Sequence, residues 1–148
     1  MPAVTMLDRI IEAAFKELIS PVVTVPTYHL SHDQTENVPP SIVIRASMGL
    51  EEPVRGSGVF SIPVEIMFTE RYDDVTPTAH SAQSSQILQC FYDSTNLSDR
   101  LNATTAIGSA RTYSAKLESS EASANNEERS YTQNYKLTVI AYPNSTAS

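Results

Sequence analysis

The chain has 148 residues, 10 of them basic and 17 acidic, so its formal net charge is −7. This length suits one domain with its own hydrophobic core, which we place over residues 1–148. The acidic balance argues against the phosphate backbone of nucleic acids as the main ligand, since that role requires a basic surface. With 19 Ser and 14 Thr but only 4 Gly, the composition favours a β-rich protein with polar surfaces.

The N-terminus and the single cysteine bear on the cellular compartment. We expect no signal peptide, because no long apolar run follows a basic start, and no membrane span, because the apolar stretches are too short. Cys90 has no partner for a disulfide within the chain; it is interpreted as a small buried hydrophobic residue, with a catalytic thiol as the alternative. The protein is therefore expected in a reducing cytoplasm, or carried from it inside a larger assembly.

A helix is predicted over Leu7–Ile19, where apolar residues recur at the helical period. Thr5 is the expected N-cap, and Pro21 is expected to end the helix after Ser20. The face that must pack on the rest of the domain consists of Leu7, Ile10, Ile11, Ala14, Phe15, Leu18 and Ile19. The opposite face is expected to stay in solvent and carries Arg9, Glu12, Lys16 and Glu17.

Three extended segments are predicted next. A short one over Val22–Leu30 contains Pro26 and is expected at a sheet edge or in a bend. The second is Ser41–Ser47, and the third, Val59–Thr69, has the clearest alternation of apolar and polar residues in the chain. In the third segment the residues expected to face the core are Phe60, Ile62, Val64, Ile66 and Phe68. Polar loops are expected between these segments, over Ser31–Pro40 and Met48–Gly58.

A second helix is predicted from Pro77 to Tyr92, after a charged turn at Arg71–Val75 and with Thr76 as its N-cap. Its first half is unusually polar and is expected to face a cavity or a partner. The residues expected to mark its faces are Ala79, Gln83, Gln86 with Ile87, and Cys90 with Phe91. Asp93–Leu101, which follows, is expected to be a loop or a single turn.

Two strands are predicted in the last third of the chain, over Ala106–Glu118 and Ser130–Tyr142. Alternation of Tyr113, Ala115 and Leu117 marks one face of the first strand. In the second strand, Tyr131 and Tyr135 share a face that is either core or a surface for other proteins. The acidic segment Ser119–Arg129 between the strands is expected to be a loop, and residues 143–148 are expected to be frayed.

The predicted order of elements is therefore α-β-β-β-α-β-β. One-sided strands with two amphipathic helices predict a small two-layer α+β domain. Its sheet is expected to be mainly antiparallel, with an N-terminal helix and a mid-chain helix packed on it.

One group of residues invites comparison with a zinc site. His29, His32 and Asp33 supply enough ligands on paper. They lie in a transition from strand to loop, where side chains at i and i+3 diverge, and no second cluster of ligands accompanies them. We therefore interpret this segment as an exposed polar loop.

Two further groups also have a simpler interpretation. Glu70, Asp73 and Asp74 could coordinate a divalent cation, but carboxylates next to a helix start favour capping and solvation. Gly56-Ser57-Gly58 differs from a nucleophile elbow, because a strand rather than a helix follows it, and a hairpin turn is expected. No catalytic, cofactor-binding or metal-binding residue is assigned, and the chain is not expected to be an enzyme or to need a cofactor.

The order of elements carries a resemblance that covers nearly the whole chain and rests on no invariant motif. The features concerned are the helix Leu7–Ile19, a linker ending in Pro39-Pro40-Ser41-Ile42-Val43-Ile44, the strand Ile62–Phe68, the helix from Pro77, and the paired strands Arg111–Leu117 and Tyr131–Ala141. In this order the chain resembles the tail-terminator, or tail-completion, proteins of long-tailed bacteriophages and their head-to-tail joining relatives. It departs from the family in its Gly-poor turns and its long Glu118–Arg129 segment.

The resemblance implies a structural virion protein that is assembled in the host cytoplasm. Copies would close into a homo-oligomeric ring, commonly a hexamer, at the head-proximal end of the tail, where the ring terminates the tail tube and joins it to the neck. The implied partners are other copies, neck or connector proteins and tail-tube proteins, with no membrane. DNA would pass through the lumen without specific binding, because an acidic lumen releases no counterions from it.

Two kinds of alternative remain open at this point. Within the virion, the chain could be a neck, connector or minor tail protein. From a different class, it could be a small-ligand-binding or hydrolytic α+β domain with its site at His29, His32 and Asp33, or at Cys90. For the ring, the segments Ser31–Pro40, Met48–Gly58 and Ser119–Arg129 are expected to reach neighbouring rings and to become ordered on assembly.

Overall fold

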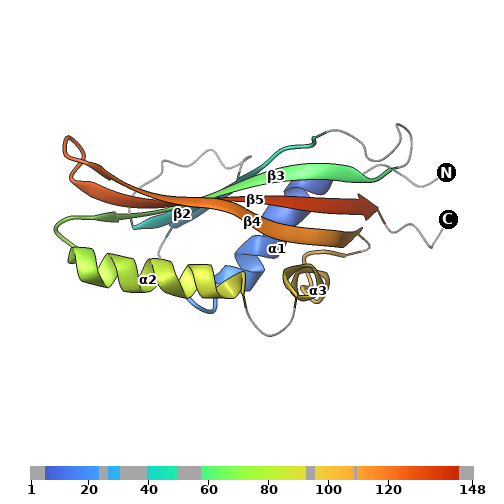
Figure 1. The fold of residues 1–148 in the computed structure, drawn as a ribbon, viewed down its shortest axis with the longest axis horizontal. Helices are drawn as coiled ribbons and strands as arrows, with labels where there is room; N and C mark the ends of the chain where they lie inside the picture. Colours follow the sequence, from blue (N-terminus) through green and yellow to red (C-terminus); the bar gives the residue numbers. More distant parts are fainter. Residues whose placement is uncertain are drawn as a thin grey trace.

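The structure is a computed structural model that describes residues 6–23, 27–30, 40–49, 58–92, 96–108 and 110–143, and of 27–30 the backbone alone. Figure 1 shows its two layers, a long twisted sheet with the helices packed against one face. The elements in chain order are α1 (Leu7–Ile19), β1 (Thr27–Leu30), β2 (Ser41–Ala46), β3 (Phe60–Arg71), α2 (Pro77–Cys90), α3 (Leu97–Asn102), β4 (Ala110–Asn125) and β5 (Ser130–Pro143).

The five described strands lie in the order β1-β2-β3-β5-β4. β1 is parallel to β2, and each of the other neighbouring pairs is antiparallel. The predicted α+β fold with a mainly antiparallel sheet is therefore confirmed. The structure adds α3, a short helix where a loop or a single turn was expected.

The core lies between the sheet and the helices. The register aligns Ile44, Ile66 and Tyr135 across three strands, and all three side chains are buried on the helix side. Helix α1 contributes Leu7, Ile11, Ala14, Phe15 and Ile19 to the same cluster, as predicted. Each large apolar side chain buried here stabilises the fold by about 1.5–3 kcal/mol.

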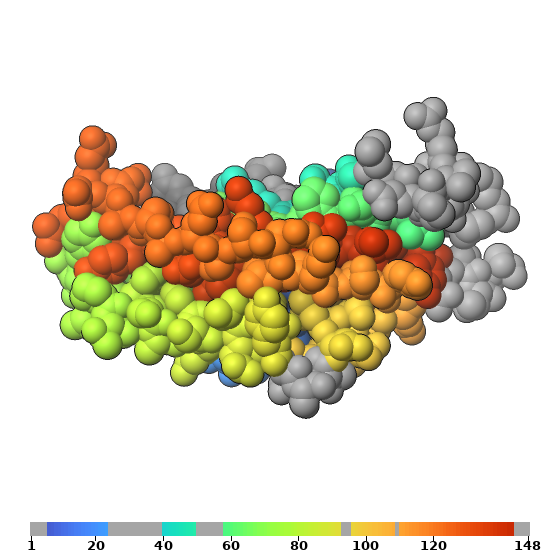
Figure 2. Space-filling view, viewed as in Figure 1, coloured from blue at the N-terminus to red at the C-terminus, as the bar shows by residue number. Residues whose placement is uncertain are grey.

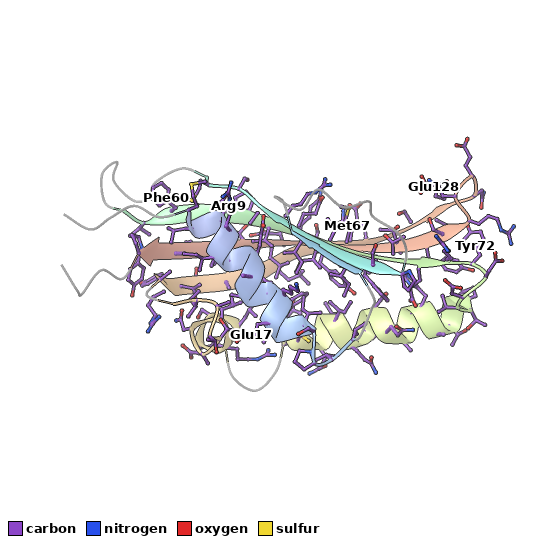
Figure 3. The ribbon with its side chains drawn as sticks, turned by 180° about the vertical axis from the view of Figure 1, so that it is seen from behind. Arg9, Glu17, Phe60, Met67, Tyr72 and Glu128 are labelled. Atoms are coloured by element: carbon purple, nitrogen blue, oxygen red, sulfur yellow. The ribbon has the colours of Figure 1, made fainter. Side chains whose placement is uncertain are left out.

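Helix α1 crosses the sheet diagonally, as Figure 3 shows from behind, and this corrects two expectations about it. Thr5 lies outside the described residues, and the residue at the N-cap is Met6, which makes no side-chain capping bond. Glu12 is fully buried rather than in solvent, because its Oε2 accepts a hydrogen bond of 2.8 Å from the backbone N–H of Ala46. That N–H lies at the end of β2, and a buried amide needs an acceptor.

Several predicted strand boundaries are corrected. β3 begins at Phe60 rather than Val59, and β4 begins at Ala110 rather than Ala106. β1 begins only at Thr27, β2 ends at Ala46, and β3 runs two residues further than expected, to Arg71. The alternation predicted for β3 is confirmed, since Ile62, Val64, Ile66 and Phe68 are buried. The predicted loops over 31–40 and 48–58 lie mostly outside the described residues.

Helix α2 begins as predicted, with Oγ1 of Thr76 accepting a hydrogen bond of 3.1 Å from the N–H of Ala79. It ends at Cys90, and its buried side is made by His80, Ser84, Ile87 and Cys90. In the first two turns this side is one residue away from the predicted positions, Ala79 and Gln83. Polar residues dominate these turns, so no apolar spacing indicates which side packs.

The largest correction concerns β4. The segment 119–129, expected to be a loop that becomes ordered on assembly, continues the strand as far as Asn125 and then turns into β5. Tyr113, expected on a regular strand face, lies at a bulge between Thr112 and Ser114 and is 77% exposed. The frayed tail expected over 143–148 lies outside the described residues except for Pro143, the last residue of β5.

Candidate interaction surface on the long hairpin

The second half of β4 and the turn that follows it are exposed throughout. Every residue from Glu118 to Arg129 is exposed, although the strand pairs with β5 without a break from Ser119, just after a bulge at Glu118, to Asn125. We call residues 118–129 the arm. Figure 2 shows it rising clear of the body at one end of the molecule. A strand that is paired yet exposed on both faces contributes little to the core, so its surface is available for contacts with other molecules.

The arm is held in shape by its own hydrogen bonds. Its pairing with β5 runs from Ser119, opposite Lys136, to Asn125, opposite Ser130. In the turn, Oδ1 of Asn125 accepts hydrogen bonds from the N–H groups of Glu127 (3.0 Å) and Glu128 (3.1 Å). The turn ends at Arg129 with φ of 52°, a left-handed conformation that non-glycine residues seldom adopt.

The base of the arm is fastened to the turn between β3 and α2 through Tyr72. The N–H of Tyr72 donates to the carbonyl of Arg129 (2.8 Å), and its hydroxyl donates to Oδ1 of Asn126 (2.9 Å). The guanidinium of Arg129 lies 5.6 Å from the centre of the Tyr72 ring and pairs with Asp73 at 3.2 Å. Figure 3 shows Tyr72 and Glu128 together at this end of the molecule, far from Phe60.

Behind Tyr72 lies a buried cluster that links the arm to α2. The ring of Tyr131 lies 4.5 Å from that of Tyr72 and stacks on His80, which in turn stacks on Phe68. Nδ1 of His80 is 2.8 Å from Oε1 of Glu70, and these two residues are only 7% and 4% exposed. The rings and this polar pair join β3, β5 and α2 directly beneath the arm, so the arm is a preorganised projection.

A second anchor lies further along α2. The hydroxyl of Tyr135 donates a hydrogen bond of 2.6 Å to the carbonyl of Ser84. Burial raises the pKa of Tyr135 above its usual value, and the hydrogen bond to Ser84 offsets only part of this rise. Of the two tyrosines whose position was open, Tyr135 is therefore core and Tyr131 is half-buried.

The outer edge of β4 is closed at one point and open beyond it. The side-chain amide of Asn102 accepts from the N–H of Thr112 (2.7 Å) and donates to its carbonyl (3.1 Å), as a neighbouring strand would. From Tyr113 to Asn125, no side chain of the described residues bonds to the backbone of this edge in the same way. Open edges are surfaces on which other chains can pair.

The carboxylates considered as a cation site do not converge. Glu70 is buried against His80, Asp73 is paired with Arg129, and Asp74 is exposed in the turn. The expectation of capping and solvation is therefore wrong for Glu70. In the described parts of the chain, no three His, Cys, Asp or Glu residues are grouped so that they could hold a metal ion.

Of the remaining candidate residues, Cys90 is described by the structure and most of the others are not. Cys90 is 4% exposed, which confirms the buried-hydrophobe interpretation. The side chain of His29, and all of His32 and Asp33, lie outside the described residues, as does most of Gly56-Ser57-Gly58; only Gly58 is described, with φ of 80°.

Sequence reasoning missed the pair formed by His80 and Glu70. One signal was available, because His80, Ser84 and Ile87 share a helix face that contains an aliphatic residue. The burial of Glu70 could not be predicted, because the expected strand ended at Thr69. Glu70 points inward only because β3 continues to Arg71.

No protein-family model matches the chain, and a search among curated proteins found no match. Among the described helices, none combines the length and the apolar character needed to cross a membrane.

Proposed function

We propose that this chain is a structural virion protein of a long-tailed bacteriophage, of the tail-terminator kind. Copies form a homo-oligomeric ring at the head-proximal end of the tail, terminate the tail tube and join it to the neck. The observation that carries the proposal is the arm of residues 118–129, which is folded and anchored but buries none of its residues in its own chain. A rigid projection of this kind suits contact with a neighbouring protein.

The two edges of the sheet support assembly as a ring. One edge is β1, with 4 residues, and the other is β4, with 16 residues. Because these edges differ, contacts that use them join unlike surfaces of neighbouring copies, and such head-to-tail contacts close into rings when the rotation allows it.

The charge of the chain supports a passive path for DNA. The net charge is −7, and the arm contributes Glu118, Glu121, Glu127 and Glu128 against Arg129 alone. A lumen with this balance adds no counterion release to DNA binding, so DNA can move through it. The same features suit a neck, connector or minor tail protein, which is the alternative within the virion.

Of the two sites considered for a small-ligand-binding or hydrolytic domain, only Cys90 lies in the described residues, since His32, Asp33 and the side chain of His29 lie outside them. Cys90 is buried at the end of α2, and His80 is enclosed between the rings of Phe68 and Tyr131. A substrate therefore reaches neither the thiol nor the imidazole without opening the core.

Native mass spectrometry of the full chain tests the proposal. The expected species is a closed oligomer, with the hexamer as the leading stoichiometry, that also binds isolated tail-tube or neck proteins. Ala122→Arg on the arm is expected to dissociate the oligomer, and Thr78→Arg, at an exposed site in the first turn of α2, serves as the matched control. A strict monomer that binds neither kind of tail protein would overturn the proposal.

A further inference from the structure

A groove lies beside the open edge of β4, between the end of α2, α3 and the strand. It has a volume of about 450 Å³ and is lined by residues that include Tyr92, Leu97, Tyr113 and Lys116. The two tyrosines are the most exposed of the large hydrophobic residues in the described chain, at 62% and 77%. Exposed tyrosines around a groove are typical of the centre of a protein interface.

The groove begins where the edge of β4 opens. Asn102 closes that edge at Thr112, and the groove is lined by the next five residues, from Tyr113 to Leu117. An extended segment of another chain laid in the groove would therefore meet unpaired backbone groups of β4 as well as the two tyrosines. This combination is characteristic of recognition by strand addition.

The charge of the groove indicates what it accepts. Lys116 is its one charged lining residue, with a side chain that is 75% exposed and lies 3.8 Å from the carboxylate of Glu118, at the rim of the groove. The groove on the open face of the sheet differs, because Arg45 and Lys136 are accompanied there by Glu65 and Glu118. A segment rich in carboxylates and small side chains thus fits the first groove better than the second.

The arm has this composition. Beside its four glutamates, its strand carries Ser119, Ser120, Ala122, Ser123 and Ala124, small side chains that let a second backbone and two tyrosine rings approach closely. Only the first arm residue contacts the groove of its own chain, since Glu118 lies 3.8 Å from Lys116; the rest of the arm continues along the same strand away from the groove. Ala122 on the arm follows Ser114 in the groove by eight positions, about 27 Å along an extended strand.

We infer that the groove beside α3 receives the acidic arm of a second copy of this chain. The inference rests on the proposed ring and specifies its subunit contact. Because the arm and the groove are unlike surfaces, each copy offers one and fills the other, and the contact propagates around the ring.

A disulfide ladder tests the contact. In a Cys90→Ala background, the full chain carries Ser114→Cys, at a partly exposed position in the groove, and Ala122→Cys, at an exposed position on the arm. A bond within one chain is excluded, because disulfides require Cα atoms less than about 7 Å apart. On mild oxidation we expect covalent multimers up to the size of the ring. The matched control pairs Ser114→Cys with Arg9→Cys, which lies on α1 away from the arm (Figure 3), and is expected to yield no ladder.

The outcomes separate the contact from the proposed function. A wild-type chain that is monomeric in native mass spectrometry overturns both. A ring without a ladder, a ladder that stops at dimers, or a cysteine at 114 that crosslinks only to a tube or neck protein overturns the arm contact and leaves the ring standing. A ladder in the control would mark nonspecific oxidation and would also overturn the contact.

Discussion

The two halves of β4 have the same secondary structure, but the first half contributes to the hydrophobic core and the second half does not. In the first half, Ala110 and Thr112 are buried, and Asn102 completes the hydrogen bonds of the edge. In the second half, residues 119–125 pair with β5 and are exposed on both faces. A strand can therefore be paired without contributing to the core. The length of the second half of β4 is not explained by a contribution to the stability of the fold.

The same contrast holds for the residues around the two halves. The first half lies beside the core cluster and α3. The second half is held by its pairing with β5 and, at its base, by Tyr72, Tyr131 and Arg129. Substitutions in the core should therefore affect folding, those at the base should affect the position of the arm, and those on the arm should affect assembly.

Phe15→Ala should have the largest effect on the core. Phe15 is fully buried in α1 and makes an edge-to-face contact with Phe91 at 6.2 Å. Truncation should lower the free energy of unfolding by about 3–5 kcal/mol, because it removes apolar contacts and leaves a cavity. Denaturant unfolding measures this loss. A loss below about 1 kcal/mol would mean that α1 contributes less to the core than its burial indicates.

Glu70→Ala should have the next largest effect and should act at the base of the arm. It leaves Nδ1 of His80 buried without the partner it now has, which costs about 1–3 kcal/mol. Hydrogen exchange should also speed up at Tyr131, whose ring stacks on His80. The double variant Glu70→Met with His80→Phe removes both polar groups and keeps an aromatic ring, so it should recover most of the stability. Equal losses in the single and double variants would contradict this account.

Tyr135→Phe should have a smaller effect that depends on pH. Loss of the hydrogen bond to Ser84 should cost about 0.5–1.5 kcal/mol at neutral pH. Burial raises the pKa of Tyr135 in the folded chain, so the folded state holds this proton more tightly than the unfolded state does. The stability linked to that proton is present below about pH 10, the unfolded value, and is lost as the pH rises above it.

Above about pH 10, the free energy of unfolding should therefore fall more steeply for the wild type than for Tyr135→Phe. The difference in unfolding free energy between the two proteins should become smaller as the pH rises. Tyr113→Phe, at a site that is 77% exposed, is the matched control and should follow the wild type. Unfolding free energies measured between pH 8 and about 11 check this, and curves for wild type and Tyr135→Phe that stay parallel would contradict it.

Local sequence patterns predicted much of the fold, because the spacing of apolar residues indicates which face of a helix or strand packs on the core. The spacing of Leu7, Ile11 and Phe15 and the alternation of Ile62 to Phe68 were sufficient for α1 and β3, and Thr76 with Pro77 located the start of α2. Each of these elements buries one apolar face, and that face is visible in the sequence.

The arm and the cluster at its base were not predicted, because nothing local encodes them. Residues 118–129 have no apolar alternation, and they are a strand only because β5 offers a partner in register. Glu12 and Glu70 are ordinary surface residues by type, and they are buried because Ala46 and His80, distant in sequence, require acceptors. These features depend on contacts between residues that are distant in sequence, so the candidate surface could be identified only from the structure.

The smallest effect on stability is expected on the arm itself. Replacing Glu121, Glu127 and Glu128 together by Ala should change the free energy of unfolding by less than about 0.5 kcal/mol, because these exposed side chains make no contact with the core. The buried carboxylate of Glu12 is the control, and Glu12→Ala should cost about 1–3 kcal/mol by removing the acceptor of Ala46. The triple variant should nevertheless assemble less readily, which sedimentation velocity measures over a range of chain concentrations. If the triple variant instead lost more than about 1 kcal/mol of unfolding free energy, the arm would stabilise the fold as the first half of β4 does, and this account of it would be wrong.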